Sequence, residues 1–312
     1  MMRGIRNIVR IIAFSILITL GSGCCIDTHA RIYERSHFKY YYSGQDETII
    51  DKLDERLRLK VRYIQDRLMN VLPGQISIYL ALTDQEFIQL THRSAPGWAG
   101  GMAYPRSNRI VVRTPLFFDQ GIPLEVLTAH EISHLVIHSI TGDNYLPRWF
   151  EEGLCQVLAG ETRQGSLGRL SRAATADRLM GLPRVDDVLS YSSPDADLAY
   201  AESRSAMQYF IDRFGWDKLR DLLTGLKQDG EFAEVFLTVT GIEYEYWQVE
   251  WIDYARERYR RAWWINIDNY IWTFTVLLGI IGMSMVLIRR KLQLRRWQDE
   301  EDEFDDNEPI HP

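Results

Sequence analysis

The residues with the clearest potential for chemistry are His130, Glu131 and His134, which form a His-Glu-x-x-His run. In an α-helix, with about 3.6 residues per turn, His130 and His134 lie about one turn apart on one face, so both imidazoles can reach a single tetrahedral zinc ion. Glu131 lies about 100° around the helix, beside the metal, where a general base for water must stand. The run therefore predicts zinc-dependent hydrolysis, and chemistry of this kind cleaves amide bonds.

A catalytic zinc ion with two histidine ligands needs one more protein ligand, with the fourth position left for water. The segment Pro-Arg-Trp-Phe-Glu-Glu-Gly-Leu at residues 147–154 is predicted to begin a second helix, and it carries the adjacent carboxylates Glu151 and Glu152. A carboxylate from this helix can complete the site, and the spacing by itself leaves both residues open.

Two further residues near these helices could be mistaken for ligands. His138 would lie about 12 Å along the helix from His130, which is too far to share an ion, so we interpret it as a structural or surface histidine. Cys155 follows Glu152 by three residues and could approach the site. A small buried hydrophobic residue is the more common role for such a cysteine.

The elements that must position these residues are predominantly helical. Pro123 suits the first turn of the helix that carries the His-Glu-x-x-His run, and Gly142 with Pro147 closes it. The other predicted elements are helices over residues 49–68, 84–90, 199–214, 216–226 and 244–261 and strands over residues 75–82 and 110–112. The pattern predicts an α+β fold, mostly helical, with a small sheet.

The motifs resemble those of the gluzincins, zinc peptidases of the thermolysin and aminopeptidase type, and in particular the peptidase-MA-like family. The resemblance covers roughly residues 51–226 and is carried by residues 130–134 and by Trp-Phe-Glu-Glu-Gly-Leu at residues 149–154. It implies that Glu152, the Glu before Gly, is the third zinc ligand, with Glu151 as the alternative. It also implies a peptide or protein substrate.

Two further site elements come from the resemblance. Gly101, Met102 and Ala103 would form an edge strand that pairs with the substrate backbone, although an ordinary Gly-rich hairpin loop explains them equally well. Ala103 stands where aminopeptidases of the family carry the Glu that binds a free amine, which favours an endopeptidase. Tyr200, at the start of a later helix, would stabilise the oxyanion, while its alternative role is a core aromatic residue.

The composition of the 312-residue chain excludes some classes of function. With 46% hydrophobic residues, the chain can bury a sizeable core and is not disordered. The formal net charge of -7 comes largely from eight carboxylates between Asp299 and Glu308, so the remainder is near neutral. No basic surface for nucleic acid is therefore expected.

Two apolar segments predict a membrane protein. Residues 11–20 follow three arginines and read as a signal peptide or an uncleaved signal anchor, with Cys24 only weakly resembling a lipidation site. Residues 270–288 contain no charge and are long enough to span a bilayer, with tryptophans before them and a cluster of basic residues after them. The positive-inside rule then places the catalytic domain outside the cell membrane and the tail in the cytoplasm.

The chain is accordingly predicted to have four parts. They are a signal peptide or anchor at residues 1–30, an extracytoplasmic zinc domain at residues 31–262, a transmembrane helix with its flanks at residues 263–291, and an acidic tail at residues 292–312. The three cysteines do not suggest a disulfide framework. The main alternative function is a non-catalytic binding module on the membrane surface in which zinc fixes two helices, although such a site normally has a fourth protein ligand.

Overall fold

The computed structural model describes residues 31–44, 46–92, 99–114, 121–190, 195–228, 230–260 and 267–305. The predicted signal segment therefore lies outside the described residues, as do the tryptophans at 263 and 264 before the predicted span. The chain divides into two compact units, Met1–Arg260 and Arg261–Pro312, and each is described by itself.

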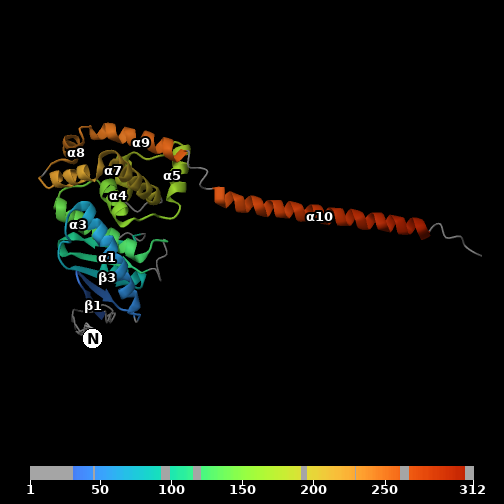
Figure 1. The fold of residues 1–312 in the computed structure, drawn as a ribbon, viewed down its shortest axis with the longest axis horizontal. Coiled ribbons are helices and arrows are strands. Elements are labelled where there is room, and N and C mark those ends of the chain that lie inside the picture. The colour runs from blue at the N-terminus through green and yellow to red at the C-terminus, as the bar shows by residue number, and fades with distance from the viewer. Residues whose placement is uncertain are drawn as a thin grey trace, which may run out of the picture. The chain divides into compact units, whose positions relative to one another are not determined.

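A mixed sheet of five strands forms one part of the first unit (Figure 1). Its strands are β1 (Arg31–Arg35), β2 (Phe38–Tyr42), β3 (Ile76–Ala81), β4 (Gly101–Tyr104) and β5 (Arg109–Arg113). Their order is β1-β2-β3-β5-β4, in which the three central strands are parallel and the two edge strands are antiparallel to their neighbours. Side chains alternate between the two faces of a strand, so the aligned residues Tyr40, Ile78 and Ile110 all enter the main core.

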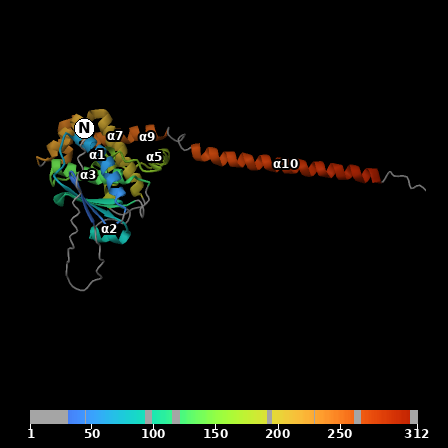
Figure 2. The same ribbon diagram turned by 60° about the horizontal axis from the view of Figure 1, so that its bottom comes forward.

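Helices cover both faces of this sheet. The helices α1 (Thr48–Leu68) and α3 (Leu124–Thr141) pack together over the main core, and Tyr40 of β2 donates a 3.0 Å hydrogen bond to Asp54 of α1. The short helix α2 (Asp84–Leu90) lies on the opposite face of the sheet (Figure 2). Its Phe87 forms a smaller apolar cluster with Val111 of β5. The site helix α3 is thus held between the sheet and the remaining helices.

The rest of the unit is a group of helices. They are α4 (Arg148–Ala159), α5 (Ser166–Thr175), α6 (Leu182–Ser190), α7 (Ala196–Leu226), α8 (Phe232–Thr240) and α9 (Tyr244–Arg260). The helices α4 and α7 cross at Gly153, where an added Cβ atom would lie 2.4 Å from the carbonyl oxygen of Ser203. Only glycine permits this close approach, which sets the position of α4.

An aromatic cluster fixes the beginning of α4. Trp149 is buried and donates from its indole nitrogen to the Tyr244 hydroxyl at 2.7 Å. Its ring also packs against Phe232 of α8 and Trp247 of α9. Because Trp149 precedes Glu151 and Glu152 by only two and three residues, this packing also restrains the two carboxylates.

Most predicted elements are confirmed. The helix with the His-Glu-x-x-His run begins after Pro123 and ends before Gly142, and the next begins after Pro147. The two helices predicted on either side of residue 215 are also present, because α7 is divided at Gly215, whose φ of 81° and ψ of 171° are not helical. The strands β1 and β2 and the helices α5, α6 and α8 were not predicted, because their short apolar runs give weak periodicity.

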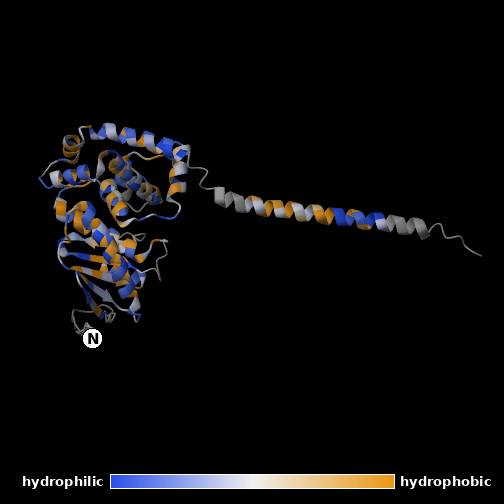
Figure 3. Cartoon of the chain, in the orientation of Figure 1, coloured by the Kyte–Doolittle hydropathy of each residue, from blue (hydrophilic) through white to orange (hydrophobic). Residues whose placement is uncertain are grey.

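The second unit contains the helix α10 (Ile267–Asp305). Within the described residues, Thr273–Trp297 is the one helical segment long and apolar enough to cross a membrane, judged by its length and composition. Its apolar side chains are exposed, and hydrophilic residues follow them along the helix (Figure 3). The helix continues past the predicted span into the acidic tail.

Candidate active site

The helix α3 brings two imidazoles together, as the sequence predicted. The Nε2 atoms of His130 and His134 lie 3.3 Å apart, and both side chains are largely buried. Ala129, Ile132 and Val136 on other faces of the same helix are fully buried. The middle of the helix is therefore enclosed on several sides, and His130, Glu131 and His134 lie largely inside the protein.

Glu152 of α4 joins this pair. Its Oε2 atom lies 3.3 Å from Nε2 of His130 and 3.9 Å from Nε2 of His134. The carboxylate thus faces the same point as the two imidazole nitrogens. Helix α4 can present it there because Trp149 anchors the beginning of the helix and Gly153 allows its close contact with α7.

Glu151 points elsewhere, because neighbouring residues on a helix project about 100° apart. Its Oε1 atom lies 2.6 Å from Nδ1 of His134 and 3.2 Å from Nε2 of His138. It therefore contacts Nδ1 of His134, the ring nitrogen that does not face Glu152. A carboxylate in this position can orient a histidine that binds a metal through its other nitrogen. His138 is partly exposed and contacts this carboxylate, in agreement with its predicted structural role.

Glu161 plays the corresponding part for His130 and was not predicted. Its Oε2 atom lies 2.7 Å from Nδ1 of His130, and its Oε1 atom accepts a 2.8 Å hydrogen bond from Nε of Arg163. Glu161 follows the end of α4, so no helical spacing links it to His130. Its only signal in the sequence is an acidic residue directly after an apolar helix.

The donor set fits a divalent metal ion. A carboxylate only accepts hydrogen bonds, so the Nδ1 atom facing it carries the hydrogen and Nε2 keeps its lone pair. Two Nε2 lone pairs and a carboxylate oxygen then point towards one position. These electron-rich atoms repel one another unless a cation lies between them. The 3.3 Å separations also match the edge of a tetrahedron with bonds of about 2.05 Å, which is about 3.3 Å long.

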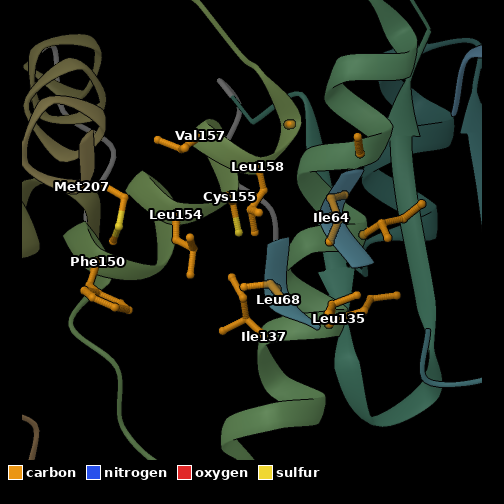
Figure 4. Packing of buried hydrophobic residues seen from close by; sticks show 14 of the residues in the cluster. Ile64, Leu68, Leu135, Ile137, Phe150, Leu154, Cys155, Val157, Leu158 and Met207 are labelled. Atoms are coloured by element: carbon orange, nitrogen blue, oxygen red, sulfur yellow. The ribbon is translucent and has the colours of Figure 1, made fainter. Parts of the chain in front are cut away.

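Cys155 offers an alternative donor. Its Sγ atom and one nitrogen of each histidine all lie within 4.8 Å of one another, so His130, His134 and Cys155 could also hold an ion. We favour Glu152 as the third donor because its oxygen lies 3.3 and 3.9 Å from the two Nε2 atoms and the imidazoles lower its pKa against burial. Cys155 lies among buried apolar side chains, including Leu154 and Leu158, and burial raises the pKa of its thiol (Figure 4).

The charges around the two imidazoles favour a cation. Burial alone would lower the pKa of His130, but the carboxylates of Glu161 and Glu152 outweigh it and hold that pKa well above its usual range. The His134 pKa is raised in the same way against burial, chiefly by Glu151. Burial alone would raise the pKa of Glu161, but the nearby His130 and Arg163 outweigh it and lower that pKa to about 2.

Glu131 differs from the other carboxylates of the site. Burial raises its pKa to about 7, although the charges of His130 and His134 act in the opposite direction. Its side chain lies against the edge strand, since a Cβ atom added to Gly101 would be 2.5 Å from Glu131 Oε1. A carboxyl group with a pKa near neutrality can both accept and release a proton.

The predicted substrate residues lie on β4, which is an edge strand of the sheet and not a loop alone. Gly101 and Ala103 project to the face that α3 covers, and Met102 lies on the other face beside Tyr104. One side of β4 pairs with β5. The strand thus runs past Glu131 at the edge of the sheet.

Tyr200 is buried on α7, close to the site. Burial raises the pKa of its phenol well above the usual range, and the nearby charge of Glu152 raises it further. Its ring stacks under the guanidinium of Arg163, with 3.9 Å between the guanidinium carbon and the ring centre. It is therefore a hydroxyl near the donor set as well as a packed core residue.

Fold and site together place a helix with two imidazoles between an edge strand and a helix with a carboxylate. The family model described as the Peptidase MA superfamily matches residues 66–257. The chain belongs to this superfamily, which confirms the predicted resemblance and indicates a peptidase. Among the curated proteins compared, none is significantly similar to the chain.

Proposed function

We propose that the chain is a zinc metallopeptidase whose metal ligands are His130, His134 and Glu152. The observation that carries the proposal is the convergence of two Nε2 atoms and one carboxylate oxygen at separations of 3.3 to 3.9 Å, with Glu131 buried beside them. Three protein donors are the number that catalytic zinc sites use.

Each residue of the site has a separate role in the proposed reaction. Zinc, when bound, supplies a Lewis acid that makes water more acidic and polarises the scissile carbonyl. Glu131 accepts a proton from the attacking water at its carboxylate and passes it to the leaving amine. Tyr200 donates its hydroxyl hydrogen to the oxyanion. Gly101, Met102 and Ala103 offer backbone groups to an extended peptide.

Cleavage of internal peptide bonds follows from the chemistry of β4. The strand carries Met102, Ala103 and Tyr104, so no carboxylate on it can bind a free terminal amine. We expect peptides blocked at both ends to be cleaved at least as well as peptides with a free N-terminus. Hydrolysis of matched blocked and unblocked peptides measures this, and a clear preference for free-amine aminoacyl substrates would refute it.

The proposed location is the cell membrane, with the catalytic domain outside. It rests on the arginines before the N-terminal apolar segment, on the apolar part of α10 and on the basic cluster that follows it. Residues 1–30 act as signal or anchor, 31–262 form the peptidase domain, 263–291 the span, and 292–312 the cytoplasmic tail. Protease added to intact cells should remove the domain and spare the tail, whereas the reverse pattern would contradict this orientation.

The decisive experiment uses Glu131→Gln on the purified protein. Glutamine keeps the size and polarity of the side chain but cannot accept the proton, so we expect hydrolysis to fall by about 10²- to 10⁴-fold. Zinc content and thermal stability should be unchanged. His130→Ala is the matched control, because loss of a ligand should remove zinc as well as activity.

A non-catalytic zinc module is the second candidate, and the position of Cys155 favours it. A thiolate from Cys155 would be the fourth protein donor that closes a structural site. In that case Cys155→Ala should release zinc and Glu131→Gln should have no effect on the function of the chain. In the peptidase, Cys155→Ala should retain zinc and Glu131→Gln should lower the function of the chain.

A further inference from the structure

Arg163 lies in the connection between α4 and α5, and its guanidinium contacts three groups. Its Nε atom donates to Glu161 Oε1 at 2.8 Å, its plane covers the Tyr200 ring at 3.9 Å, and its Nη1 atom lies 3.8 Å from Asp197. Only 16% of the side chain is exposed. A guanidinium has a rigid planar fork, so it can stack on a ring and bind a carboxylate at once.

One of these contacts leads to His130. The carboxyl group of Glu161 is 1% exposed, and it divides its two oxygens between Arg163 and Nδ1 of His130. The backbone of Glu161 is also fixed, because its N–H donates to the carbonyl oxygen of Gln156 at 2.8 Å. Arg163 is therefore linked to a metal-ligand imidazole through a single, restrained carboxylate.

The other contact leads to the proposed oxyanion donor. The Tyr200 ring lies under the guanidinium of Arg163, and the Tyr200 carbonyl accepts a 3.1 Å hydrogen bond from Gln156 of α4. The backbone of Tyr200 is thus fixed to α4, while the direction of its ring depends on the surface that packs against it. Arg163 provides part of that surface.

We propose that Arg163 is a positioning residue that orients both His130, through Glu161, and Tyr200, through stacking. This inference rests on the proposed zinc peptidase function. The two effects are separable, because the first requires positive charge at Glu161 and the second requires a flat group over the ring. Lysine keeps the charge without the plane, and methionine keeps the side-chain volume without either property.

The test compares Arg163→Lys and Arg163→Met with Arg169→Met in the full-length protein. Arg169 is the matched control because it also pairs with Asp197, at 2.9 Å, and bonds to the Gln164 carbonyl. Zinc retention is measured against a chelator, kcat and KM are measured with a blocked peptide, and the absorption spectrum is recorded for the Co²⁺-loaded protein as a probe of ligand geometry.

We expect Arg163→Met to weaken zinc binding by about 10- to 100-fold, the usual effect of losing the support of a metal ligand. It should also lower kcat and shift the Co²⁺ spectrum. Arg163→Lys should retain zinc to within about threefold and keep the native spectrum while kcat falls and KM stays constant. Arg169→Met should match the native protein in every measurement.

Arg163→Met leaves the buried Glu161 without its cation and could prevent folding. The double variant Glu161→Gln with Arg163→Met removes that unpaired charge, and it should fold and lose zinc as the single variant does. The inference is overturned if the Arg163 variants match Arg169→Met in zinc retention, spectrum and kcat. A native protein that holds no zinc or cleaves no peptide would instead overturn the proposed function itself.

Discussion

The site has a helical side and a strand side, and the two are built differently. On α3 and α4, buried imidazoles and carboxylates lie beside one another, and each charge changes the pKa of its neighbours. On β4, by contrast, the residues are uncharged and half-buried. The helical side can hold a cation and move protons, whereas the strand side can bind only what every peptide shares, its backbone.

The strongest test of the helical side separates Glu152 from Glu151. Alanine at Glu152 removes the carboxylate that faces both Nε2 atoms, so we expect nearly complete loss of zinc and activity. Alanine at Glu151 removes only the support of His134 and should weaken zinc binding by about 10- to 100-fold. Metal analysis after dialysis against a mild chelator measures both variants, and equal losses or the reverse order would contradict the assignment.

Gly101 connects the two sides, and its substitution tests how closely they must fit. A Cβ atom there would collide with Glu131, so Gly101→Ala should displace the base and lower kcat by on the order of 10²-fold. Zinc content should stay native because the ligands lie on α3 and α4. Ala103→Gly, at the next position on the same face, is the control. A native kcat in Gly101→Ala would show that Glu131 is not held against the strand.

The pH dependence of the reaction tests the buried base. Glu131 must be ionised to accept a proton, and burial raises its pKa to about 7 in the metal-free protein. A protonated Glu131 cannot act as the base, so kcat/KM should fall about tenfold per pH unit below its pKa. Bound zinc favours the ionised form, so the fall should begin below about pH 7 in the zinc-loaded protein. Glu131→Gln should remove this limb from its residual activity, and an unchanged profile in that variant would argue against Glu131 as the base.

The smallest effect is expected at Cys155. If Glu152 is the third ligand, Cys155 is only a packed neighbour, and Cys155→Ala should change zinc content and kcat by less than about twofold. Thermal stability should decrease slightly, because the smaller side chain leaves a cavity in the apolar layer of α4. Loss of zinc in this variant would instead favour the closed, non-catalytic site.

The parts of the site that follow from the sequence are those in which the reactive residues recur with the period of a helix. The spacing of His130 and His134 determines that they share a face, and Pro123, Gly142 and Pro147 mark the helix boundaries that the structure contains. Strands β1 and β2 were missed because five-residue runs carry little periodic signal. The place of β2 in the sheet is decided by its pairing with β3, a partner more than thirty residues away in the chain, and β1 then pairs with β2.

The information that can be read along the chain is therefore local: which residues can bind a cation, and which of them one helix presents together. Which of two adjacent carboxylates faces the imidazoles depends on the rotation of α4, and the packing of Trp149 and Gly153 sets that rotation. The tertiary structure also brings Glu161 to His130 across a gap of thirty-one positions. Contacts of this kind depend on how separate elements pack, and no period in the sequence encodes them.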